Sequence, residues 1–187
     1  MICRNNTVYD HSEIRRIHAQ AAGYLRRQGI SLEDSTVIVR ADTEAWIDGF
    51  TSKREPDVLG TTRWEGQPRR ARGSVYVEIA AGIPRPQMHA TISHELGHVV
   101  FARTNALSEL PHMISEGIAE AIAAQYLEAT LAYRDARSAI DEMAARTDPI
   151  YGVGFRLARR AIAQHGLMSI INACATGDPG AIGLGVR

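Results

Sequence analysis

The sequence predicts an α+β fold, with an N-terminal helix and a small mixed sheet followed by a mostly helical C-terminal half. Three observations support this class: apolar residues recur at helical spacing near the N-terminus, two short β-branched runs follow, and helical spacing dominates after residue 84. The 187 residues suit one domain with a sizeable core. We therefore expect a single domain over 1–187, with a sheet-containing part over about 1–84, a helical part over about 85–175 and a loose tail over about 176–187.

The first element should be an amphipathic helix over residues 12–28, because its apolar residues share one face and arginines lie between them. Ser12 is the expected N-cap, since its hydroxyl can accept a hydrogen bond from a backbone N–H of the first turn. Gly29 is the expected end of the helix. The apolar stripe consists of Ile14, Ile17, Ala21, Tyr24 and Leu25.

Two β-branched runs predict strands at 36–40 and 74–79. In the second run, Val75, Val77 and Ile79 occupy alternate positions, so their side chains should share one face of the sheet.

The segment between these strands is less regular. Asp42 is the expected N-cap of a short helix that runs through Phe50. Residues 51–73 are rich in Gly, Pro and Arg, which predicts a loop with one short strand near Thr61–Trp64.

After Pro84 and Pro86 the pattern becomes helical. The expected helices cover residues 87–103, 111–132, about 134–146 and about 150–165, and a short helix follows Gly166.

Composition limits the classes of partner and the compartment. The formal net charge is +0, which gives no reason to expect nucleic acid or an anionic membrane as a partner. No stretch approaches the roughly 20 apolar residues of a membrane-spanning helix. The two cysteines, Cys3 and Cys174, do not make a disulfide framework. We expect a cytoplasmic protein, and no pattern in the sequence indicates an oligomeric state.

The clearest chemical signal is His94-Glu95-Leu96-Gly97-His98. Helical residues four apart rise about 6 Å along nearly the same face, so His94 and His98 could bind one zinc ion. Glu95 projects about 100° further round the helix and could act on a water molecule as a general base. The alternative is that two histidines share a helix face without binding a metal. Gly97 within a helix suggests that another backbone passes close by.

A catalytic zinc needs a third protein ligand, and Glu116 is the candidate. It follows His98 by 18 positions, which leaves room for a turn and a second helix that returns across the first. Glu120 lies one turn beyond Glu116 and could accept the free N–H of a ligating histidine. The alternative for both glutamates is a solvated helix stripe.

These residues resemble the gluzincin metallopeptidases, the thermolysin-like group in which a glutamate on the following helix is the third zinc ligand. The resemblance rests on His94–His98 and on Ser115-Glu116-Gly117-Ile118-Ala119-Glu120, and it implies a minimal peptidase domain with a zincin-like fold. Residues 149–155, with Tyr151, are similar to the "Y-x-x-G-F" element of leukotriene-hydrolase-type aminopeptidases. In that family the tyrosine stabilises the transition state. The resemblance covers about residues 88–166.

The resemblance also implies an edge strand to which an extended peptide substrate adds. We place it at residues 75–79, with Val75, Val77 and Glu78 as candidate substrate-binding residues. Glu78 could bind an amine or be an exposed strand residue. The glycine-rich, glutamate-containing aminopeptidase motif is not found in this region, so the sequence does not support aminopeptidase specificity.

The predicted function is zinc-dependent hydrolysis of peptide bonds in a peptide or small protein. His94, His98 and Glu116 would hold Zn²⁺, which activates a water molecule, with Glu95 as general base and Tyr151 as oxyanion stabiliser. One alternative is a non-catalytic or regulatory partner-binding protein on the same fold. Another is an iron oxygenase with two histidines and one carboxylate, which would give Glu95 and Tyr151 no role.

Overall fold

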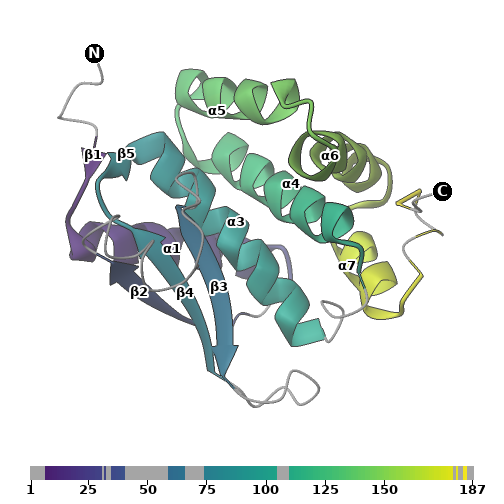
Figure 1. Ribbon diagram of the computed structural model, residues 1–187, viewed down its shortest axis with the longest axis horizontal. Coiled ribbons are helices and arrows are strands. Elements are labelled where there is room, and N and C mark those ends of the chain that lie inside the picture. Colours follow the sequence, from purple (N-terminus) through teal and green to yellow (C-terminus); the bar gives the residue numbers. More distant parts are fainter. Residues whose placement is uncertain are drawn as a thin grey trace.

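The computed structural model describes residues 7–30, 32, 35–40, 59–65, 74–104, 110–178, 180 and 183–184. Its elements form an α+β arrangement in which helices predominate (Figure 1). The short helix expected from Asp42 through Phe50 lies outside the described residues.

The N-terminal helix α1 (His11–Arg27) confirms the predicted amphipathic helix, and all five residues of its expected apolar stripe are buried. Ser12 is not the N-cap. That position belongs to Asp10, whose extended backbone directs its carboxylate to the first turn, where it accepts a hydrogen bond from Ser12 N at 2.8 Å. Gly29 follows the helix with a φ of 84°, as expected of a glycine that ends a helix.

Three strands form a mixed sheet in the order β2-β4-β3, with bounds Ser35–Arg40, Ser74–Ala80 and Gly60–Glu65. β4 runs parallel to β2 and antiparallel to β3. The mixed character is as predicted, but the placing of residues 75–79 at the edge of the sheet is wrong. β4 is the middle strand, because the short strand predicted near residues 61–64 forms as β3 and pairs with the second side of β4.

A separate pair of two-residue strands, β1 (Thr7–Val8) and β5 (Ile83–Pro84), joins the N-terminus to the segment after the sheet. This pair was not predicted, since two-residue strands carry too little periodicity to be recognised in a sequence.

One face of the sheet is covered by helices. α3 (Arg85–Thr104) lies against β3 and β4, and α1 packs beside it (Figure 1). The buried row Val75, Val77 and Ile79 alternates with Tyr76 and Glu78 along β4, so the two sets lie on opposite faces. The row of Val75 faces the helices and is part of the hydrophobic core.

The C-terminal half is built around α4 (His112–Thr130), which is buried along most of its length. α3 lies on one side of α4, and α5 (Tyr133–Ala145) and α6 (Gly154–His165) lie on the other (Figure 1). α7 (Leu167–Ala175) packs near the end of α3 and beside α6. These four helices follow the predicted ranges to within a few residues. The helix expected from residue 150 instead begins with a π-helical turn, η2 (Pro149–Val153).

The described part of the tail beyond residue 175 contains no long helix or strand. Leu184 is nevertheless buried in the core, so the tail is anchored at this residue. Among the helices of the described residues, none is both long and apolar enough to cross a membrane.

Candidate metal centre

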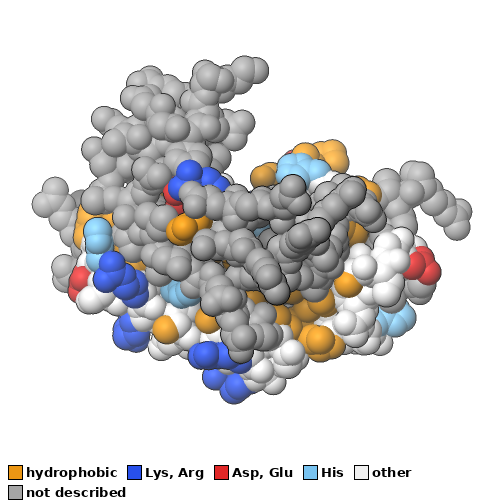
Figure 2. Space-filling view, turned by 90° about the horizontal axis from the view of Figure 1, so that it is seen from below, with side chains coloured by type: hydrophobic (Ala, Val, Ile, Leu, Met, Phe, Trp, Pro, Cys, Tyr) orange, Lys and Arg blue, Asp and Glu red, His pale blue; other side chains and the backbone are white. Residues whose placement is uncertain are grey.

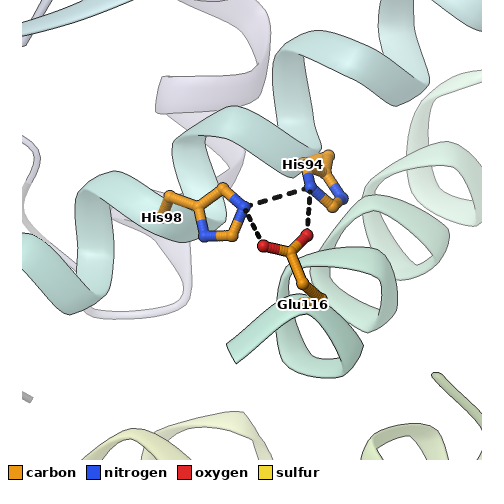
Figure 3. Close-up of side chains that lie close together, drawn as sticks. All are labelled: His94, His98 and Glu116. Atoms are coloured by element: carbon orange, nitrogen blue, oxygen red, sulfur yellow. Dashed lines mark hydrogen bonds and ion pairs between the residues drawn. The ribbon is translucent and has the colours of Figure 1, made fainter. Parts of the chain in front are cut away.

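Three side chains predicted to bind a metal converge between α3 and α4 (Figure 3). His94 and His98 project from one face of α3, and the Glu116 carboxylate reaches them from α4. The two Nε2 atoms are 3.1 Å apart. Glu116 Oε2 lies 3.2 Å from His94 Nε2, and Glu116 Oε1 lies 3.4 Å from His98 Nε2.

These separations fit a small tetrahedral cation. Zinc binds imidazole nitrogen and carboxylate oxygen at about 2.0–2.2 Å, so two ligand atoms of a tetrahedron should be about 3.3–3.6 Å apart. The separation of the two Nε2 atoms and the distance from each Nε2 to its neighbouring carboxylate oxygen lie near this range, and the two nitrogens approach different oxygens of Glu116. Among the described residues the cluster offers two histidines and one carboxylate, which would leave one position of a tetrahedral ion for another ligand.

Close packing of the two helices makes this convergence possible. A Cβ added to Gly97 of α3 would lie 2.8 Å from Ala119 Cα and 3.0 Å from Ala119 Cβ of α4. The expectation that another backbone passes close to Gly97 is therefore confirmed. On the far side of α4, Gly117 lies directly against Gly154 at the start of α6, so α4 is held tightly from both sides.

The close contacts within the cluster shift the pKa values of His94 and Glu116. Burial disfavours the charged form of His94, but the hydrogen bond to Glu116 and the charges of Glu120 and Glu95 outweigh it and raise its pKa to about 9. Burial likewise opposes ionisation of Glu116, but hydrogen bonds from His94 and His98 outweigh it and lower its pKa. The carboxylates around His94 therefore favour a positive charge at this position.

Glu95 points from α3 toward the sheet and is buried. Its Oε2 accepts a hydrogen bond from Thr62 Oγ1 of β3 at 2.7 Å, and its backbone oxygen lies 3.0 Å from the same hydroxyl. Two residues earlier on the same strand face, a Cβ on Gly60 would come within 2.8 Å of Glu95 Cγ and 2.9 Å of Oε1. Gly60 and Thr62 therefore fix the carboxylate that the sequence predicts to be the general base.

Glu120 lies near His94 but not in hydrogen-bonding contact with it. Glu120 Oε1 is 4.0 Å from His94 Nδ1, which is an ion-pair separation. The same oxygen accepts a hydrogen bond from Arg146 Nη1 at 2.6 Å. The predicted direct bond between Glu120 and a histidine is thus replaced by an ion pair with Arg146.

Tyr151 belongs to η2, and its side chain is partly exposed. Asp148 caps this turn by accepting a hydrogen bond from Tyr151 N at 2.7 Å. The tyrosine ring centroid lies 5.8 Å from the guanidinium carbon of Arg146. Tyr151 is therefore linked to Glu120 through Arg146, and its role as oxyanion donor stays a prediction.

The candidate substrate-binding residues on β4 are wrongly placed. Val75 and Val77 are buried in the core between the sheet and its helices, where no substrate can reach them. Glu78 is also buried, and it accepts a hydrogen bond from Arg63 Nη2 at 2.8 Å. Because it alternates with Val77, Glu78 lies on the sheet face opposite to Thr62 and Glu95. It is neither exposed nor near the metal centre.

Four further residues at the site were not identified from the sequence: Gly60, Thr62, Arg146 and His112. His112 Nε2 lies 3.2 Å from Glu116 Oε1, and the His112 side chain is exposed. The spacing of four residues before Glu116 was the available signal. The other three lie on elements remote in sequence from the zinc motif, and no local pattern marks them.

On the face shown in Figure 2, the basic side chains stand in separate small groups rather than in one broad patch. No protein family model, curated protein or solved structure matches this chain. The chemistry of the site must therefore be argued from its own residues.

Proposed function

We propose that this protein is a zinc-dependent peptide hydrolase with a gluzincin-like site on a zincin-like fold. One observation carries the proposal. His94, His98 and Glu116 converge at spacings near those of a tetrahedral site, and Glu95, which follows His94 on α3, presents a second buried carboxylate. A structural metal site would have no use for that additional carboxylate.

The chemistry divides among a few groups. When bound, zinc supplies Lewis acidity for polarising a peptide carbonyl and activating water. Glu95 accepts the proton of the attacking water and passes it to the leaving amine. The Thr62 hydroxyl keeps the Glu95 carboxylate in one orientation, which reduces the reorganisation needed during reaction. Tyr151 donates a hydrogen bond to the developing oxyanion.

The substrate strand binds at β3 rather than at β4. Of the described strands, β4 alone pairs with β3, so the other side of β3 can accept an extended peptide. Thr62 and Gly60 place this strand directly beside Glu95. A peptide added there would run past the carboxylate that must reach its scissile bond.

The proposal is tested by incubating the zinc-loaded protein with a mixed peptide library and identifying products by mass spectrometry. Cleavage should occur without chelator, disappear with it, and return on adding zinc. Glu95→Gln should bind zinc as the parent does but lose about 10³-fold or more in turnover, since general-base catalysis of this kind contributes about 10²–10⁴-fold.

The matched control is Glu128→Gln, which removes an exposed carboxylate of α4 and should leave cleavage unchanged. Zinc binding without any cleavage by the parent would refute the hydrolase and favour the non-catalytic, partner-binding alternative. Tight binding of iron in preference to zinc would favour the oxygenase.

A further inference from the structure

Arg146 follows the last residue of α5 and contacts two other elements of the site. Its Nη1 donates a hydrogen bond to Glu120 Oε1 on α4 at 2.6 Å. Its guanidinium carbon lies 5.8 Å from the ring centroid of Tyr151 in η2, within the range of a cation–π contact. One side chain therefore joins the carboxylate beside a candidate metal ligand to the candidate oxyanion donor.

The Glu120 contact bears on the orientation of His94. The Glu120 side chain is only 7% exposed, and a buried carboxylate needs a partner of opposite charge. Its Oε1, the atom held by Arg146, is also the atom 4.0 Å from His94 Nδ1. Since His94 Nε2 faces the metal position, the group near Nδ1 influences how the ring is turned.

The backbone of Arg146 is fixed as well. Arg156 Nη1 of α6 donates hydrogen bonds to the carbonyl oxygens of Ala144 at 2.9 Å and Arg146 at 2.7 Å. Gly152 of η2 lies directly against the Arg146 carbonyl group, where a side chain would collide with it. Arg146 and the turn that carries Tyr151 are therefore built as one packed unit.

We propose that Arg146 is a positioning residue that sets Glu120 beside His94 and holds the Tyr151 ring, so that metal-ligand orientation and oxyanion stabilisation depend on one guanidinium. This inference rests on the proposed function for the part played by Tyr151. The part that concerns Glu120 and His94 depends only on metal binding.

Cobalt(II) binding tests the metal-binding part without any assay of activity. The visible absorption spectrum and the Co²⁺ dissociation constant are measured for the parent, Arg146→Met, Arg146→Lys and Glu120→Gln, each checked for folding by circular dichroism. Arg146→Met and Glu120→Gln should both alter the spectrum and weaken Co²⁺ binding by about 10-fold or more. Arg146→Lys, which still donates to Glu120, should lie between Arg146→Met and the parent.

Arg159→Met is the matched control. Arg159 also combines a carboxylate and an aromatic ring, since it bonds Glu128 at 2.8 Å and lies 5.8 Å from the ring centroid of Phe155. Neither partner belongs to the candidate site. Its substitution should leave the cobalt spectrum and affinity as in the parent.

A double-mutant cycle with Tyr151→Phe tests the second part. Arg146→Met should lower kcat by about 10-fold or more with little change in KM, and should have much less effect when Tyr151 is already Phe. If Arg146→Met lowered kcat by the same factor in the parent and in Tyr151→Phe, Arg146 would not act through Tyr151.

The two proposals fail in different ways. A parent that binds cobalt and cleaves no peptide contradicts the hydrolase, while the cobalt comparison still decides the role of Arg146. Folded Arg146→Met and Arg146→Lys variants with the parent's cobalt spectrum and affinity would overturn the positioning role, whatever the activity.

Discussion

At the scale of single residues, the carboxylate of Glu95 shows how the fold fixes the direction of a buried acidic side chain. Its neighbour in sequence, His94, faces α4, whereas Glu95 faces β3 and is held there by Thr62. The helix thus presents a metal ligand and a candidate base in different directions from adjacent positions. Gly60 leaves the space that the carboxylate occupies.

Thr62→Val replaces the hydroxyl with a methyl group of similar size, so it should remove the hydrogen bond to Glu95 without opening a large cavity. A hydrogen bond to a charged group contributes about 1.5–3 kcal/mol, and we expect kcat to fall by roughly 10- to 100-fold. The measurement is kcat and KM on a cleaved library peptide, together with zinc content, which should not change.

Thr62→Ser is the control, because it retains the hydroxyl and should keep most of the activity. Equal activity in Thr62→Val and the parent would show that Glu95 does not need this bond.

At this scale the sequence predicts the candidate metal ligands, but it does not predict the residues that hold the neighbouring side chains in place. His94 and His98 lie in one helix, so local geometry alone places them together. Glu116 could be predicted because the chain between it and His98 is long enough for the end of one helix, a turn and the start of a second helix. Thr62 reaches Glu95 only through the register of β3 on β4, which depends on pairing between distant segments.

At the scale of elements, the pairing of α3 with α4 provides a second contact remote from the metal centre. His89 Nδ1 and Tyr126 Oη are 2.8 Å apart and buried, and the two rings stack. Burial lowers the pKa of His89 to about 4, and the charges of Arg85 and Arg16 act in the same direction against the opposing charge of Glu13.

This pKa predicts how stability depends on pH. Between about pH 6.5 and 4, the unfolded chain protonates His89 and the folded chain does not, so the unfolded state binds more protons. The free energy of unfolding should therefore decrease by up to about 3 kcal/mol as pH falls through this window. Above about pH 6.5 this histidine should contribute no pH dependence.

Urea unfolding of the parent and of His89→Gln, measured from pH 4.5 to 7.5, checks this prediction. The variant should be less stable near neutral pH and show a shallower loss of stability on acidification. His165→Gln, at an exposed position, should retain the parent's slope. The same slope in His89→Gln and the parent would assign the pH dependence to other groups.

A single sequence predicts where helices and strands lie along the chain better than it predicts how they are arranged in space. Helices and the strands at 35–40 and 74–80 follow from local periodicity, and their predicted ranges are close to those observed. Local periodicity does not give the order of the strands in the sheet. The segment that forms β4 was therefore predicted at an edge, although β4 is the central strand. The π-helical turn η2 was read as ordinary helix, because one extra residue per turn leaves little trace in apolar spacing over five residues.

At the scale of the whole molecule, the candidate metal centre lies between α3, which packs on the sheet, and α4, around which the other C-terminal helices pack. α3 supplies His94 and His98 while packing on the sheet, and α4 supplies Glu116 while packing on α5 and α6. A cation held by all three side chains would therefore connect the helix that covers the sheet to the helix at the centre of the C-terminal bundle. Its binding energy should appear in the stability of the whole fold.

We expect zinc to raise the melting temperature measured by calorimetry. A ligand at 100 times its dissociation constant stabilises the folded state by about 2.7 kcal/mol, which corresponds to roughly 5–10 °C for a chain of this size. Chelator should reverse the shift. His98→Ala, which removes one of the three converging groups, should abolish most of it.

His112→Ala separates the metal ligands from their neighbour. His112 also lies within 3.2 Å of Glu116 but on the exposed side, and its removal should leave the zinc-dependent shift intact. A loss of the shift in His112→Ala would add this histidine to the ligand set and close the fourth position. In that case the fold would hold a structural ion, and the hydrolase would lose its open coordination site.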